Sequence, residues 1–359
     1  MEEELPKEPG YFKGRGSQIN PHNRFFKQEY VQEHIEGIDI PFLQSEKTEI
    51  IYTHPKTIIN KITSPDLVGM YSMNPYQGCE HGCIYCYARN AHEYWGFSAG
   101  LDFERKIIVK EHAAEILAKE LSNPRWIPEP IMLSGNTDCY QPLEKRFGIT
   151  RKMLGVLLKF KHPVSIISKN QLIRRDIDIL KELAKLNLVH VMISITGLDE
   201  SLRLKLEPRT ATYKQRLETV RALADAEIPV GVMTAPIIPG LNSHEIPDII
   251  KAAAEAGAKS IGYTMVRLNG AIGGIFKDWL FKNFPDRADK VWHHIEGVHG
   301  GQVNDSRFGT RMKGEGPMAE SIHKLHKMAR EKYLPKDDPF EFDLSHFDHR
   351  AGDAQLSLF

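Results

Sequence analysis

The sequence is poor in cysteine, carries no excess of either charge and has no long apolar run. Its four cysteines among 359 residues are too few for the disulfide framework of a secreted domain. Lysine plus arginine and aspartate plus glutamate number 47 each, so the chain lacks the basic balance of a typical nucleic-acid-binding domain, and such a role needs a local patch. No apolar run reaches the length that a membrane-spanning helix needs.

The first residues, 1–7, are acidic and lack the apolar centre of a secretory signal peptide. We therefore expect no membrane association, and the low cysteine content indicates the reducing cytoplasm. A chain of this length has room for one large domain with appendages, or for two domains.

Three of the cysteines, Cys79, Cys83 and Cys86, stand close together in a C-x3-C-x2-C spacing. Three thiolates on one tight loop suit three corners of a [4Fe–4S] cluster. The fourth iron then has no protein ligand and is open to a substrate or cofactor, as in catalytic metal sites. Gly78 and Gly82 suit a tightly folded loop. A structural zinc site completed by a nearby histidine is the alternative, although this spacing is not usual for zinc.

Short apolar runs alternate with helical patterns from about residue 66 onward. We predict strands at 68–73, 130–133, 164–168, 189–195, 230–235 and 260–265. Helices are predicted between them at 111–121, 150–160, 176–186, 213–226 and 244–257, with Thr150 and Asp176 as N-terminal caps. These six repeats indicate an α/β fold with a parallel sheet and crossover helices, short of the eight repeats of a closed barrel.

The remaining parts of the chain are predicted as appendages. Residues 1–60 form a polar N-terminal arm that contains Gly14-Arg-Gly-Ser17 and a short strand near 48–53. The arm either packs over the domain or contacts an anionic partner such as a nucleic acid. Residues 271–359 form a helical extension, with a glycine-rich linker at 270–274, helices near 277–296 and 317–333, and a poorly ordered acidic tail after Leu334.

Several motifs resemble those of the radical S-adenosylmethionine (radical SAM) superfamily, in its spore photoproduct lyase-like branch. They are the stretches 74–89, 137–144, 207–210 and 235–242. The Gly-Arg-Gly arm resembles that of a bacterial subfamily. The resemblance covers roughly residues 48–270 and implies a partial (β/α)6 TIM-type barrel over 61–270, whose catalytic residues lie at the C-terminal ends of the strands. It also implies a [4Fe–4S] cluster and SAM as cofactors.

The resemblance assigns Cys79, Cys83 and Cys86 as cluster ligands. It implies that Tyr87 lies against SAM and relays the radical, and that Tyr85 is either a second relay or a structural residue.

Four more positions are implied to contact SAM. Asn136 and Thr137 occupy the strand end that contacts its amino group, with the neighbouring Asp138 orienting them. Lys169 reaches the SAM carboxylate or is merely solvated, and Ser194 lies near the ribose or serves as a core hydroxyl. Arg209 either pairs with an anion or braces Glu207.

Cys139 lies close to the position of a cysteine that donates hydrogen in spore photoproduct lyase, but it follows the local Thr-Asp pair, whereas the lyase cysteine precedes its own Thr-Ser-Asp. It is therefore either a hydrogen donor or a buried bystander, because free cysteine commonly behaves as a small core residue.

The resemblance implies an enzyme that generates a 5′-deoxyadenosyl radical, with a reductant such as flavodoxin or ferredoxin as its partner. The substrate stays open between a nucleic-acid lesion and a peptide, protein or small metabolite, because a shared fold does not determine function. A basic rim for nucleic acid would draw on Lys145, Arg146, Arg151, Lys152, Lys169, Arg174 and Arg175. A non-catalytic iron–sulfur or zinc protein is the further alternative.

Overall fold

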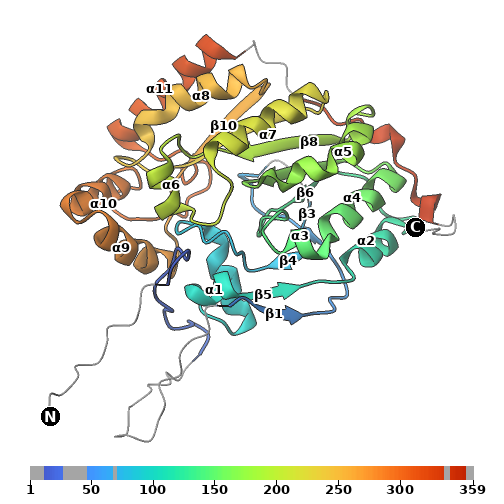
Figure 1. The fold of residues 1–359 in the computed structure, drawn as a ribbon, viewed down its shortest axis with the longest axis horizontal. Coiled ribbons are helices and arrows are strands. Elements are labelled where there is room, and N and C mark those ends of the chain that lie inside the picture. Colours follow the sequence, from blue (N-terminus) through green and yellow to red (C-terminus); the bar gives the residue numbers. More distant parts are fainter. Residues whose placement is uncertain (1–11, 27–46, 68–70, 335–339, 353–359) are drawn as a thin grey trace, which may run out of the picture.

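The framework of the fold is a twisted sheet of six parallel strands with one antiparallel strand at its edge (Figure 1). The computed structural model describes residues 12–26, 47–67, 71–334 and 340–352. In spatial order the parallel strands are β3 (Tyr71–Met73), β6 (Ile131–Leu133), β7 (Val164–Ser168), β8 (Val189–Ser194), β9 (Val230–Ile237) and β10 (Ser260–Met265). The edge strand β2 (Ile59–Lys61) runs antiparallel to β3. The α/β partial barrel is confirmed.

The parallel strands are short and apolar because helices and loops cover them. In β7, Val164, Ile166 and Ser168 are buried while the alternate residues are less so, as expected for side chains that point to opposite faces. The strands follow one another in sequence order. All six C-terminal ends therefore meet at one edge of the sheet, where such folds place their sites.

Helices form an outer layer along the sheet (Figure 1). The layer contains α2 (Ala113–Leu121), α4 (Ile149–Phe160), α5 (Ile177–Ala184), α7 (Tyr213–Asp225), α8 (Ile246–Glu255) and α11 (Gly316–Tyr333). The short helices α3 (Glu144–Phe147), α6 (Glu200–Leu206), η2 (Gln171–Asp176) and η3 (Ser243–Glu245) lie in the connections. None of the helices within the described ranges is long and apolar enough to cross a bilayer.

A second, small sheet supports the cysteine loop. Its strands are β1 (Glu49–Tyr52), β5 (Lys106–Val109) and β4 (Tyr76–Gln77), in that spatial order. The predicted strand near 48–53 is thus confirmed, and it pairs in parallel with β5. The cysteines follow β4 and lead into the 3₁₀ helix η1 (Tyr87–Trp95), which precedes α1 (Leu101–Arg105).

Two predicted helix caps differ from the structure. Thr150 lies inside α4, and its hydroxyl donates to the carbonyl of Cys139 at 2.6 Å. Asp176 precedes α5 but makes no capping bond, because its carboxylate accepts hydrogen bonds from Tyr140, Arg151 and Arg175. Both side chains form tertiary contacts in place of the local ones that the sequence suggests.

The C-terminal extension also differs from its prediction. The expected linker at 270–274 is the start of α9 (Ile272–Asn283), which buries Ile275, Phe276 and Leu280. That burial outweighs the low helix propensity of its two glycines, about 1 kcal/mol each. A short turn, η4 (Pro285–Arg287), separates α9 from α10 (Ala288–Gly297).

The tail beyond α11 was expected to be poorly ordered, and for residues 340–352 this is wrong. Phe347 packs edge-on against His162, with ring centroids 5.3 Å apart. The backbone N–H of Asp348 donates to the carbonyl of Phe160 at 3.1 Å. The tail includes the short turns η5 (Leu344–His346) and η6 (His349–Gly352). Residues 68–70 of the first predicted strand lie outside the described residues.

Candidate active site

The cysteine loop is buried at the C-terminal edge of the sheet. Cys79 and Cys83 are buried and Cys86 is partly buried, and all are free thiols. Gly78 and Gly82 have φ of +80° and +69°, which side chains disfavour. Burial raises the pKa of the Cys79 and Cys83 thiols, so without a metal they would stay protonated. Iron that replaces the proton removes this penalty, as in other thiolate sites.

Backbone and amide hydrogen bonds hold the loop in place. The N–H of Cys79 donates to the carbonyl of Phe103 at 2.9 Å. The amide of Gln141 binds the loop twice, donating to the Gly78 carbonyl at 3.2 Å and accepting from the Glu80 N–H at 3.0 Å. The loop is therefore positioned by its surroundings before any ligand binds.

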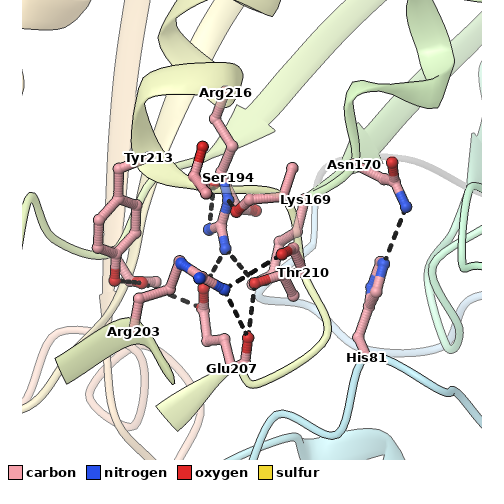
Figure 2. Close-up of polar contacts among 12 residues, drawn as sticks. His81, Lys169, Asn170, Ser194, Arg203, Glu207, Thr210, Tyr213 and Arg216 are labelled. Carbon is pink, nitrogen blue, oxygen red and sulfur yellow. Dashed lines mark hydrogen bonds and ion pairs between the residues drawn. The ribbon is translucent and has the colours of Figure 1, made fainter. Parts of the chain in front are cut away.

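The zinc alternative depended on a histidine beside the cysteines. His81 lies 3.3 Å from the carboxylate of Asp138 and 3.3 Å from the amide of Asn170 (Figure 2). Within the described ranges, no three or more Cys, His, Asp or Glu side chains converge to hold a single ion. A cube-shaped cluster does not need such convergence, because each thiolate binds a different iron.

The predicted SAM-contacting residues lie at three neighbouring strand ends. Asn136 and Thr137 follow β6, Lys169 follows β7, and Ser194 ends β8. The Asn74 side chain accepts from the backbone N–H groups of Asn136 and Thr137 at 2.9 and 3.1 Å. Their strand ends are adjacent because β6, β7 and β8 are adjacent in the sheet.

Asp138 connects two of these strand ends to the cysteine loop. Its carboxylate accepts from the Ser168 hydroxyl at 2.9 Å and from the Lys169 N–H at 2.8 Å, and it faces His81. Burial alone would raise its pKa, but His81 and the hydrogen bonds from Lys169 and Tyr140 lower it to about 2. Asp138 is thus an ionised residue that orients its neighbours.

Two buried polar groups at this edge lack a hydrogen-bond partner within the described part of the chain. The Thr137 hydroxyl and the Gln77 amide nitrogen make no hydrogen bond to any described residue. Since buried polar groups are nearly always paired, these two are suited to a bound ligand. Together with the buried thiols, they fit a cluster and an amino-acid-bearing cofactor at this site.

Glu207 is the centre of a buried hydrogen-bond network (Figure 2). Its carboxylate accepts from the Tyr85 phenol, from Arg216 and, at 3.0 Å, from the Thr196 hydroxyl. Arg216 also donates to the Ser194 carbonyl at 3.0 Å. Burial would raise the pKa of Glu207, but Arg216, Lys169 and Tyr85 lower it to about 2. Burial and this carboxylate raise the pKa of Tyr85, which therefore stays protonated.

Sequence reasoning missed Arg216 and Thr196. Arg216 lies within α7, where a charged residue normally faces solvent, yet it is fully buried. The available signal was Glu207 itself, because a buried carboxylate requires a cation. The proposed brace of Glu207 by Arg209 is wrong, since Arg209 instead lies 3.7 Å from Glu80.

The two tyrosines lie in different environments. Tyr85 is buried, with the Lys169 ammonium 5.9 Å from its ring centroid. Tyr87 is 59% exposed, and its phenol donates to the Gly135 carbonyl beyond β6. Cys139 is fully buried in the main core, and its N–H donates to Ser134 at 2.9 Å.

The N-terminal segment 14–17 docks beside the cysteine loop. Glu104 accepts from the N–H groups of Gly16 and Ser17 at 2.9 and 2.8 Å, and Arg15 donates to its carbonyl at 2.6 Å. Glu104 also pairs with the fully buried Arg89 at 2.5 Å, and Arg89 donates to the Cys83 carbonyl at 3.0 Å. Arg15 is itself buried, so it contacts the domain and does not present an exposed basic surface.

The comparisons with known proteins identify the family. A model described as the radical SAM superfamily matches residues 73–253. The chain belongs to the radical SAM superfamily. It is therefore an enzyme whose cofactors are a [4Fe–4S] cluster and SAM, and it needs an electron donor.

The chain is also similar to proteins of other organisms and to solved structures. An uncharacterized protein of Mycobacterium tuberculosis is 34% identical over 238 residues, which are 66% of this chain and 70% of that protein. One of Methanocaldococcus jannaschii is 27% identical over 69% of this chain and 88% of its own length. A spore photoproduct lyase mutant has a TM-score of 0.60 at 14% identity over 82% of both chains. Another, with bound AdoMet and dinucleoside spore photoproduct, has a TM-score of 0.56 at 13% identity over 82% of both chains. The likeness shows a shared fold.

Replacing Gly16 by alanine should impair cluster binding. A Cβ on Gly16 would lie 1.8 Å from the backbone oxygen of Gly82, so the loop must shift, at about 1–3 kcal/mol. We expect lower iron and sulfide contents after anaerobic reconstitution. Gly297→Ala is the control, because its Cβ would meet open space. A full cluster in Gly16→Ala would show that the arm does not position the loop.

Glu207→Gln should destabilise the protein far more than Tyr85→Phe. The first change leaves Arg216 as a buried charge without its carboxylate, which costs about 3–5 kcal/mol. The second removes one hydrogen bond, worth about 1 kcal/mol, and keeps the ion pair. Chemical denaturation followed by circular dichroism measures the free energy of unfolding of each variant. Equal losses in the two variants would show that the ion pair stabilises the protein no more than the Tyr85 hydrogen bond does.

Proposed function

We propose that this enzyme cleaves SAM reductively and abstracts hydrogen from its substrate. The observation that carries the proposal is that Thr137, Lys169 and Ser194 lie at three adjacent strand ends, on the edge that also holds the three cysteines. A binding protein without turnover needs none of these strand-end groups. When bound, the cluster and SAM supply a 5′-deoxyadenosyl radical.

The residues of this chain bind and orient the cofactor in our proposal. Cys79, Cys83 and Cys86 hold the cluster. Lys169 receives the SAM carboxylate, with its backbone held by Asp138 at 2.8 Å. Thr137 offers its unpaired hydroxyl to the amino group.

Other proposed roles rest more on the resemblance. Ser194 lies by the ribose, Asn136 by the amino group and Tyr87 against SAM. The Tyr85 phenol, bonded to Glu207, is either a relay or part of the buried network. Arg209 is proposed to pair with an anion. Cys139 can donate hydrogen only if the fully buried thiol becomes accessible to the substrate. Flavodoxin or ferredoxin is the proposed donor, in a reducing cytoplasm.

A nucleic-acid lesion is the first candidate substrate, because the fold is that of a lyase solved with a dinucleoside photoproduct. Lys145, Arg146 and Lys152 are exposed on α3 and α4 and offer a local basic patch. Other members of the predicted rim are engaged internally: Arg151 pairs with Asp176 at 2.9 Å, and Arg175 pairs with Glu144 at 2.7 Å. This internal pairing and the neutral net charge favour a peptide, protein or small metabolite as the second candidate.

Reduction with dithionite in the presence of SAM should yield 5′-deoxyadenosine. We expect Cys83→Ala to abolish the product and Thr137→Val to weaken SAM binding about tenfold, the loss of one hydrogen bond to a charged group. Anaerobic chromatography and equilibrium binding measure these effects. Stoichiometric zinc in place of iron, with no cleavage, would overturn the proposal.

A mobility-shift titration at several salt concentrations should separate the substrate classes. If the substrate is nucleic acid, damaged DNA binds more tightly than undamaged DNA, and the affinity falls steeply with salt because phosphate contacts release counterions. Replacing Lys145, Arg146 and Lys152 by glutamine together should reduce that slope. Salt-independent or absent binding would favour the peptide or metabolite class.

A further inference from the structure

The chain immediately after β10 places two polar side chains on one face. The N–H of Val266 donates to the Ile237 carbonyl at 2.9 Å, and that of Leu268 donates to the Val303 carbonyl at 3.1 Å. Val266 and Leu268 are buried in an apolar cluster. Because side chains alternate along extended backbone, Arg267 and Asn269 lie on the opposite face, at the C-terminal edge of the sheet.

Arg267 is a cation without a carboxylate partner among the described residues. Its Nε is buried with no hydrogen bond to a described residue, and its Nη1 donates to the Met312 sulfur at 3.4 Å. The nearby carboxylates are used elsewhere: Asp305 pairs with Arg307 at 2.8 Å, and Asp66 pairs with Arg311. Burial, with repulsion from Arg311, lowers the pKa of Arg267.

Arg216 and Arg89, which are fully buried, differ from the partly buried Arg267. Arg216 pairs with Glu207 and donates to two backbone carbonyls. Arg89 pairs with Glu104 and donates to three. A partly buried charge without such partners is costly, so Arg267 is not explained as a structural brace.

Three side-chain amide oxygens without a hydrogen-bond partner in the described part of the chain lie near Arg267. The side-chain oxygens of Asn269, Asn304 and Asn90 are buried and have no partner among the described residues. Asn304 follows Val303, which pairs with Leu268, and the Asn90 amide donates to the Asn269 carbonyl at 2.8 Å. Four unsatisfied groups thus gather around residues 267–269.

Arg267 and the three amide oxygens lie at a different strand end from the residues proposed to hold SAM, which favours the substrate as their ligand. The residues proposed to hold SAM end β6, β7 and β8, whereas Arg267 follows β10, two strands further along the sheet. The Asn90 amide, on the helix η1 that follows the cysteines, donates to the Asn269 carbonyl at 2.8 Å, so the group borders the cysteine loop.

We propose that Arg267 binds an oxyanion of the substrate, a phosphate or a carboxylate, while the unpaired side-chain oxygens of Asn269 and Asn304 accept hydrogen bonds from an N–H or O–H group that the substrate carries beside it. The proposal rests on the proposed function and names the group that its substrate must carry. A guanidinium suits both oxyanions because its N–H donors match their paired oxygens.

The test titrates oxyanion probes into the reconstituted, SAM-loaded enzyme by calorimetry. The probes are inorganic phosphate, the dinucleotide TpT and acetate. We expect Arg267→Gln to weaken binding of the preferred probe about tenfold or more, as for a lost charge-assisted contact, and Arg267→Lys to retain part of it. Arg221→Gln is the matched control, because Arg221 is exposed on α7 in the outer helical layer; it should bind like the wild type.

Thermal unfolding separates binding from folding. Arg267→Gln should leave the melting temperature of the probe-free protein unchanged or raise it, since it removes an unpaired charge. Preference for TpT over acetate assigns a phosphodiester, and the reverse assigns a carboxylate.

Three results would overturn the subsite: no probe binding by a wild type that cleaves SAM, an equal loss of SAM affinity in Arg267→Gln, or a lowered melting temperature with unchanged probe binding. A wild type that fails to cleave SAM would instead defeat the proposed function.

Discussion

The buried ion pair between Glu207 and Arg216 joins the cysteine loop to the barrel. Through Glu207 it holds Tyr85 from the loop and Thr196 from beyond β8, and through Arg216 it holds the Ser194 carbonyl. A carboxylate and a guanidinium that are both fully buried are tolerated only when their remaining hydrogen-bonding groups are satisfied. This requirement gives the region one arrangement, because a shift of any member leaves a buried charge unpaired.

Other carboxylates beside the cysteine loop are also paired with a cation or an imidazole. Glu104 pairs with Arg89, which holds the Cys83 carbonyl, and Asp138 faces His81 between two of the cysteines. The buried Glu207 and Glu104 and the partly buried Asp138 thus surround the C-x3-C-x2-C segment, each with its own cation or imidazole. The loop is held by side-chain electrostatics where it lacks regular secondary structure, and a cluster site needs this rigidity so that three thiolates meet three irons.

Because most buried charges at this site are paired, the buried polar groups without a partner among the described residues are candidates for ligand contacts. Thr137 and Gln77 lie unpaired near the proposed SAM residues, and Arg267 lies unpaired beyond β10. The fully buried arginines Arg89 and Arg216 are each paired with a carboxylate, whereas the partly buried Arg267 has no carboxylate partner among the described residues. The two sets divide the C-terminal edge into a cofactor side and a proposed substrate side, with Tyr87 at the cysteine loop between them.

Local patterns were enough to predict the six strands and most of the helices, because apolar periodicity is encoded in neighbouring residues. The cysteine spacing, also local, is what predicts the cluster ligands. They failed where a distant contact decided the outcome. Thr150 bonds to Cys139 instead of capping a helix, residues 272–274 are helical because α9 buries its apolar face, and Phe347 orders the tail against His162. Arg216 and Arg267 carry no local signal at all. The sequence by itself determined the chemistry, since ligand type and spacing are local, whereas only the tertiary structure decided which buried charges find partners.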